Sequence, residues 1–174
     1  MNHYTNTENP IDFPKSALKH AKGNLLDLAE AGEFDVIIHG CNCFNTMGGG
    51  IAREIRERYP EVATVDSKTV SGDYNKLGNW TNETVIRKNG SVEFIVLNCY
   101  TQYNMSRGHD VFEYAAFQLI LQKIEKQYGD QRLGLPYIGT GLAGGNKERI
   151  MAMIEHFAIN VSAKGGNVTL VEFG

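Results

Sequence analysis

The sequence predicts an α/β layer sandwich whose central strands are largely parallel. Apolar runs of strand length alternate with amphipathic segments of helical period along most of the 174 residues. This order is typical of helices packed on a mostly parallel sheet. Two glycine-rich loops support it, because Gly48-Gly49-Gly50 and residues 139–145 each follow an apolar run. Ligands of such sheets bind at the carboxyl ends of the strands, where both loops are expected.

In the first half of the chain, the elements follow from hydrophobic period and from chain breakers. The continuous apolar run at 35–41 indicates a buried strand. The helix that follows the three glycines ends at Pro60, and we expect its charged residues, from Arg53 to Arg58, to face water. The expected elements are a strand at 17–21, a helical turn at 27–31, a strand at 35–41, and helices at 50–59 and 61–69.

The second half continues the alternation. Asn89-Gly90 lies between two strand-like runs and is a strong hairpin signal. Asp110 is placed to cap a long amphipathic helix, and Tyr137 is expected in the core. The expected elements are strands at 77–87 and 92–100, a helix at 110–128, a strand at 133–138, a helix at 147–162 and a strand at 167–173.

Length and composition indicate an ordinary globular protein. We expect one domain over residues 17–174, preceded by an arm or edge strand at 1–16, and a monomer in solution. A net charge of −3 argues against a nucleic-acid binder, which would show a basic face. No apolar run approaches the length of a membrane span, and the polar first fourteen residues do not resemble a signal peptide. These observations predict a cytoplasmic protein with no membrane partner and no sequence-specific nucleic-acid partner.

Three cysteines are interpreted as buried, reduced thiols. Cys41, Cys43 and Cys99 lie in or beside predicted strands, where free cysteine behaves as a small apolar residue. Their spacing does not match a metal site. We therefore expect neither a metal nor another cofactor.

Both glycine loops are candidate phosphate sites. Main-chain N–H groups and the dipole of a following helix both attract an anion. Two such loops at one sheet edge predict a single ligand with two phosphates; turn geometry alone is the alternative explanation for the glycines. The residues predicted to contact the ligand here are Gly48, Gly49, Gly50, Ile51, Gly139, Thr140, Gly141, Leu142, Ala143 and Gly144.

These motifs together resemble the macro domain family of ADP-ribose-binding modules, over residues 22–174. The opening Lys22-Gly23-Asn24-Leu25 is similar to the family element that reads adenine. The run from His39 to Cys43, followed by the three glycines, resembles its first ligand loop. The run from Leu135 to Gly141 resembles the second, which cradles the diphosphate. The resemblance implies a three-layer α/β/α sandwich with a mixed, centrally parallel sheet.

Within this family, the sequence most resembles the fungal-type ADP-ribose 1″-phosphate phosphatases. These share the His-x-Cys-Asn-Cys run, here His39 to Cys43, and a following Arg-Tyr-Pro, here Arg58-Tyr59-Pro60. The chain departs from a branch that removes ADP-ribose from glutamate or thymidine. That branch uses a lysine after the fourth strand and an aspartate in the second loop, where this chain has Gln102-Tyr103 and Ala143.

Two further departures concern other positions. Asn24 stands where many members carry an aspartate, and an amide there can bond the adenine edge but adds no charge. Asn146-Lys147 replaces an Asp-Trp pair of many bacterial relatives.

The phosphatase resemblance assigns candidate chemical roles. On residues alone, a single histidine at the end of an apolar strand is typical of a satisfied core residue. The resemblance instead makes His39 a catalytic acid, base or nucleophile, and the residues do not decide between these roles. Asn42 could orient the terminal ribose or a water, or cap the loop, and Asn45 has a similar ligand role. Asp110 is the assisting carboxylate or a simple helix cap; Arg107 and His109 are candidates to hold the 1″-phosphate.

Three functions remain open at this stage. The first is hydrolysis of ADP-ribose 1″-phosphate to ADP-ribose and phosphate. The second is removal of ADP-ribose from a protein or nucleic acid, which the missing lysine and loop aspartate disfavour. The third is a non-catalytic reader, which needs only the ligand cradle. In each case the expected partner is a small molecule or group, ADP-ribose or its 1″-phosphate.

Overall fold

The computed structural model describes residues 17–105, 111–139 and 144–173, which form one six-stranded mixed sheet. The strand order is β1-β6-β5-β2-β4-β3. Every neighbouring pair is parallel except β3 with β4, which is antiparallel. The strands are β1 (Leu18–Lys22), β2 (Val36–Cys41), β3 (Trp80–Arg87), β4 (Val92–Tyr100), β5 (Arg132–Leu135) and β6 (Asn167–Glu172). The predicted α/β sheet with a parallel centre is confirmed.

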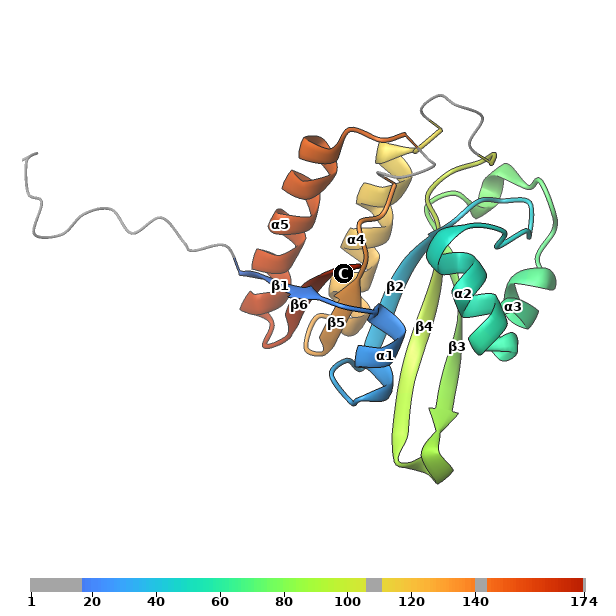
Figure 1. The fold of residues 1–174 in the computed structure, drawn as a ribbon. Coiled ribbons are helices and arrows are strands. Elements are labelled where there is room, and N and C mark those ends of the chain that lie inside the picture. The colour runs from blue at the N-terminus through green and yellow to red at the C-terminus, as the bar shows by residue number, and fades with distance from the viewer. Residues whose placement is uncertain (1–16, 106–110, 140–143, 174) are drawn as a thin grey trace, which may run out of the picture.

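Helices cover both faces of this sheet, which gives the predicted three layers (Figure 1). Helices α4 and α5 lie together on one face, and α1, α2 and α3 lie on the other. Their bounds are α1 (Leu25–Glu30), α2 (Gly50–Arg58), α3 (Pro60–Ser67), α4 (Tyr114–Tyr128) and α5 (Lys147–Ala163), with short 3₁₀ turns at Tyr74–Lys76 and Lys88–Gly90.

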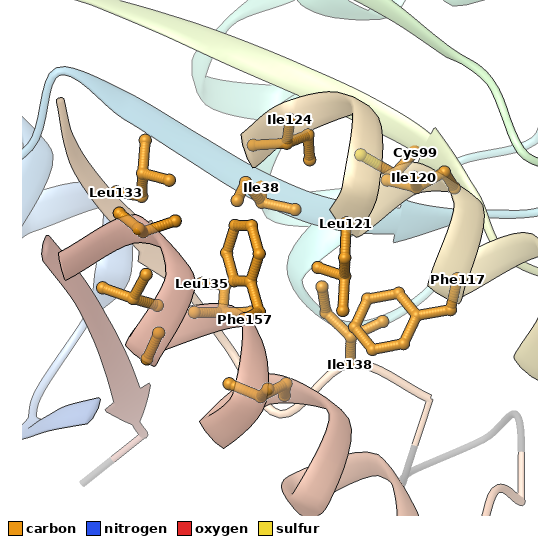
Figure 2. Close-up of a cluster of buried hydrophobic side chains, with 14 of the residues drawn as sticks. Ile38, Cys99, Phe117, Ile120, Leu121, Ile124, Leu133, Leu135, Ile138 and Phe157 are labelled. Atoms are coloured by element: carbon orange, nitrogen blue, oxygen red, sulfur yellow. The ribbon is translucent and has the colours of Figure 1, made fainter. Parts of the chain in front are cut away.

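Two hydrophobic cores follow from the alternation of side chains along the buried strands. In β2, Val36 and Ile38 point toward α4 and α5, whereas Ile37 and Cys41 point toward α1 and α2. Figure 2 shows the first core, in which Phe117 from α4 and Phe157 from α5 pack over the sheet. Because β2 is buried on both faces, it reads as a continuous apolar run.

Two predicted boundaries are corrected by the structure. The strand expected at 133–138 ends at Leu135, because Pro136 has no N–H to donate to the ladder. The long helix begins at Tyr114 with Glu113 as its N-cap residue, not at Asp110, which lies outside the described residues. The division between an N-terminal arm and the domain at residues 16 and 17 stays a prediction.

Candidate ligand-binding cavity

A cavity of about 540 Å³ crosses the carboxyl ends of the five parallel strands. Its wall passes from the end of β1 through β6, β5 and β2 to the end of β4, in the order of the strands in the sheet. Ligand sites of open α/β sheets lie at this edge. Apart from the start of α2, the lining residues that the structure describes are Gly23, Asn24 and Leu25 after β1; Val171 and Phe173 from β6 and beyond; Pro136, Tyr137, Ile138 and Gly139 after β5; Gly40 in β2; and Thr101 and Gln102 after β4.

The first glycine loop meets the cavity at the start of α2. Gly49 is the N-cap residue of this helix and makes no side-chain cap hydrogen bond. Gly50 has φ +55°, a backbone conformation that favours glycine. Gly49, Gly50 and Ile51 line the cavity, and the first-turn N–H groups of a helix lack intrahelical acceptors. Gly48 is exposed and does not line it.

The second loop enters the cavity through Gly139. This residue has φ +78°, and an added Cβ would lie 2.4 Å from the Phe112 ring, so both backbone and space require glycine. The Gly145 N–H donates to the Gly139 carbonyl over 2.7 Å and closes the loop. Gly144 does not line the cavity, and Thr140, Gly141, Leu142 and Ala143 lie outside the described residues. Tyr137, which the sequence placed in the core, both packs on the core and lines the cavity.

The opening element forms the β1 end of the cavity. Gly23, at φ +139°, donates its N–H to the Glu172 carbonyl over 2.9 Å and joins β1 to β6. Asn24 is the N-cap of α1, since its Oδ1 accepts from the N–H groups of Leu26 and Asp27. These residues lie beside Phe173, whose side chain is 80% exposed.

Thr101 and Gln102 form the opposite end, and sequence reasoning missed Thr101. The Thr101 hydroxyl is buried and has no hydrogen-bond partner within the described part of the chain. It faces Gly40, where an added Cβ would come within 2.8 Å of Oγ1. The Gln102 amide donates to the Asn104 carbonyl over 2.8 Å. An unpaired buried hydroxyl costs free energy, so Thr101 is suited to bond a group that enters here. The sequence signal that could have identified Thr101 is its position, since it is a polar residue directly after a central strand.

His39 is buried in the core instead of lining the cavity. Its side chain has no exposed surface and lies on the face of the sheet that packs against α3. Asn98 donates its amide to Val62 and Thr81, which leaves its Oδ1 to accept from His39 Nε2–H over 2.6 Å. Burial lowers the pKa of His39 to about 4, although the Asn98 bond opposes this shift. This placement does not support a catalytic role and fits the satisfied core residue.

Asn42 and Asn45 hold the first loop and do not line the cavity. Asn42 accepts from the Phe44 N–H over 2.8 Å and donates to Thr46 over 2.7 Å. Asn45, at φ +59°, accepts from the buried Lys76 ammonium over 2.6 Å. For Asn42, these contacts fit the alternative in which its side chain caps the loop backbone.

The three cysteines are buried and free, as predicted. Burial raises the pKa of Cys43 to about 11 and also raises the pKa of Cys41 well above its usual range, so both remain thiols near neutral pH. Asp110, Arg107 and His109 lie outside the described residues. Within the described ranges, no three His, Cys, Asp or Glu side chains are grouped to hold a metal, and no helix is both long and apolar enough to cross a membrane.

Comparisons with known proteins bear on the family and the fold of this chain. No family model matches the chain. It is 30% identical over 148 residues to an uncharacterised 17.5 kDa protein of phage T4, across 81% of this chain and 90% of that protein. It is 26% identical over 154 residues to an ADP-ribose 1″-phosphate phosphatase of Lodderomyces elongisporus, across 83% of this chain and 96% of that protein.

Solved structures share the fold at lower identity. The macrodomain of Mycobacterium tuberculosis DarG superposes with a TM-score of 0.66 at 15% identity, over 88% of this chain and 96% of that one. A Trypanosoma brucei macrodomain in complex with ADP-ribose gives 0.60 at 15% identity, over 92% and 67%. The order of strands in the sheet and these superpositions show that the chain has the macrodomain fold. Within that class, the chain belongs to the same family as the phage T4 protein.

Proposed function

We propose that this protein binds ADP-ribose in the strand-end cavity and hydrolyses ADP-ribose 1″-phosphate to ADP-ribose and phosphate. The observation that carries the binding proposal is the cavity itself, which has main-chain glycines at its centre and an exposed aromatic ring at one end. A structural neighbour from Trypanosoma brucei was solved with ADP-ribose. A relative carries the name of the phosphatase.

The diphosphate is held by main-chain groups in this proposal. Glu54 is the one Asp, Glu, Lys, Arg or His side chain among the described lining residues, so no cation of this wall touches the phosphates directly. The first-turn N–H groups of α2 and the Gly139 loop supply the donors. Lys147 adds positive charge close to the wall, since its Nζ lies 4.8 Å from the ring centre of the lining residue Tyr137.

The terminal ribose and its phosphate occupy the β4 end. Thr101 offers there a hydroxyl that has no hydrogen-bond partner among the described residues. Asp110 remains the assisting carboxylate that the sequence predicts, able to orient a water for attack on phosphorus. His39 has a structural role in this proposal. Its imidazole has no exposed surface and contributes to the packing of β2.

A non-catalytic reader of ADP-ribose is the second candidate. The observation that favours it is the chemistry of the described wall at the β4 end, where Thr101 and Gln102 are neutral. Neither side chain is a general base near neutral pH.

The test is calorimetry with ADP-ribose and phosphate release from ADP-ribose 1″-phosphate, on wild type and on Gly49→Glu. The substitution places a bulky anion at the start of α2, so we expect at least about tenfold weaker binding, or about 1.4 kcal/mol. Thr64→Glu is the matched control, because it adds the same charge on the exposed side of α3.

The results separate the candidates. Binding with phosphate release supports the phosphatase, and binding without release supports the reader. Equal affinity of Gly49→Glu and wild type would remove the first loop from the site. No affinity of wild type for ADP-ribose would remove both functions.

A further inference from the structure

The wall between α1 and α2 holds a polar pair that the sequence did not predict. Asn24 and Glu54 both line the cavity, and Asn24 Nδ2 donates to Glu54 Oε1 over 2.7 Å. Asn24 follows β1, whereas Glu54 lies in the second turn of α2. The pair therefore joins two elements that are 30 residues apart in the sequence.

The carbonyl oxygen of Asn24 is fully used in this arrangement, and one of its two amide N–H groups donates to Glu54. Its carbonyl oxygen accepts from the Leu26 N–H over 2.9 Å and from the Asp27 N–H over 3.0 Å. An amide oxygen has two lone pairs, and both are used to cap α1. Asn24 has no acceptor left for a ligand and acts as a positioning residue for Glu54.

Glu54 has one carboxylate oxygen to spare. Oε1 accepts from Asn24 and lies 3.5 Å from Arg58 Nη1, while Oε2 has no hydrogen bond within the part of the chain that the structure describes. Arg58 makes its shorter contacts to Asp27 and Glu30. Its positive charge is therefore shared among three carboxylates and does not serve Glu54 alone. The wall thus presents a carboxylate oxygen, which can accept but not donate.

This oxygen lies at the apolar end of the cavity. Leu25, Val171 and the exposed Phe173 ring belong to the same β1–β6 end. A flat aromatic base fits such a surface with its face on apolar side chains, and its polar edge then meets the carboxylate of Glu54. The opposite end, at Thr101 and Gln102, offers no aromatic ring among its described lining residues.

We propose that Glu54 selects the nucleobase of the ligand, with Asn24 fixing its carboxylate. This inference rests on the proposed binding of ADP-ribose. The free oxygen accepts a hydrogen bond from an exocyclic amine, which adenine carries at its 6-position. Hypoxanthine carries a carbonyl oxygen there, whose lone pairs face those of the carboxylate. Discrimination therefore arises from repulsion of the wrong base as well as attraction of the right one.

The experiment compares ADP-ribose with inosine diphosphate ribose, its hypoxanthine analogue, by calorimetry on wild type and Glu54→Gln. Wild type should prefer ADP-ribose by about tenfold or more, the size of one hydrogen bond to a charged group. Glu54→Gln can still accept from Asn24, and its amide can turn a donor toward either base. We expect its preference to fall to within about threefold, mostly through weaker ADP-ribose binding.

Glu57→Gln is the matched control. Glu57 lies on the same helix, is exposed, pairs with Arg53 and does not line the cavity. It removes the same charge, so both affinities should stay at the wild-type values. The melting temperature of each variant reports whether α2 remains packed.

Each result decides the inference. Equal affinity of wild type for the two ligands, or an unchanged preference in Glu54→Gln, overturns the role of Glu54 while ADP-ribose binding stands. A parallel loss of both affinities in Glu54→Gln also overturns it, because that pattern marks a general effect on the wall. If wild type binds neither ligand, the proposed function itself fails, and this inference fails with it.

Discussion

Within β2, two residues before its end, a histidine is held neutral by its surroundings. His39 is buried without exposed surface, and burial lowers its pKa to about 4. In the unfolded chain a histidine has a pKa near 6.5. The unfolded state therefore binds a proton that the folded state excludes, and the stabilising contribution of neutral His39 is fully present only above about pH 6.5.

This residue makes stability depend on pH in a window between about 6.5 and 4. As the pH falls through this window, protonation favours the unfolded state, and we expect about 2 kcal/mol to be lost between pH 7.5 and 5.0. Urea unfolding at the two values measures it. In His39→Gln the group does not titrate, so the loss should shrink by about that amount. An equal loss in the variant would contradict the assignment.

The same variant tests the chemistry. If the imidazole acted on the phosphate, His39→Gln would abolish phosphate release from ADP-ribose 1″-phosphate at pH 7.5. Because the side chain does not reach the cavity, we expect release to continue wherever the variant is folded. The sequence could locate His39 at the end of a buried strand. It could not tell which face of the sheet the ring occupies, since this depends on Asn98 in a strand 59 residues away.

At the scale of elements, Arg58 links α2 to α1 through ion pairs. Its guanidinium contacts Asp27 over 2.8 Å and also binds Glu30, which accepts from the Tyr59 hydroxyl as well. The Tyr59 hydrogen bond and the Arg58 charge hold the pKa of Glu30 below its usual range, against the effect of burial. The sequence assigned the charged run from Arg53 to Arg58 to a solvated face. Helical period identifies one apolar stripe, but it does not show that α1 packs beside the charged side.

The two arginines of α2 should therefore differ in their contribution to stability. Arg58→Met leaves the partly buried Glu30 carboxylate without its cation, and we expect a loss of about 1–3 kcal/mol in the free energy of unfolding. Arg53→Met breaks an exposed pair with Glu57, where the two side chains are 63% and 57% exposed. There we expect about 0.5 kcal/mol or less. Equal losses in urea unfolding would show that Arg58 is not a link between helices.

At the scale of the whole molecule, the sequence predicted the elements better than their arrangement. Strand and helix periods, Pro60 and the Asn89-Gly90 turn are local signals, and the elements that they predict are present with small shifts. The order of strands in the sheet depends on long-range pairing that no local pattern contains. For this reason the sequence missed Phe173 and Glu54 as cavity residues. They join the glycine loops only because β6 lies between β1 and β5, and because α2 lies against α1.

This arrangement predicts how a bound ligand changes the dynamics of the molecule. A ligand that binds only the folded state stabilises it by RT ln(1 + [L]/Kd), about 2.7 kcal/mol at a concentration one hundred times Kd. Amides in the centre of the sheet, such as Ile37 in β2 and Leu97 in β4, exchange with solvent through global unfolding. When ADP-ribose is present at one hundred times its Kd, these amides should exchange about 100-fold more slowly.

Amide exchange in two other regions should respond differently to the ligand. Amides at Gly50 and Ile51 line the cavity, so contact with the ligand should slow their exchange directly. Amides in the turn at Lys88–Gly90 lie between β3 and β4, away from the strand ends that form the cavity. They exchange through local opening, which leaves the ligand bound, so their rates should not change. Slowing at the turn equal to that at Gly50 would place the ligand elsewhere. A ligand at the carboxyl ends of the parallel strands does not contact the far end of the hairpin, which stays free to open.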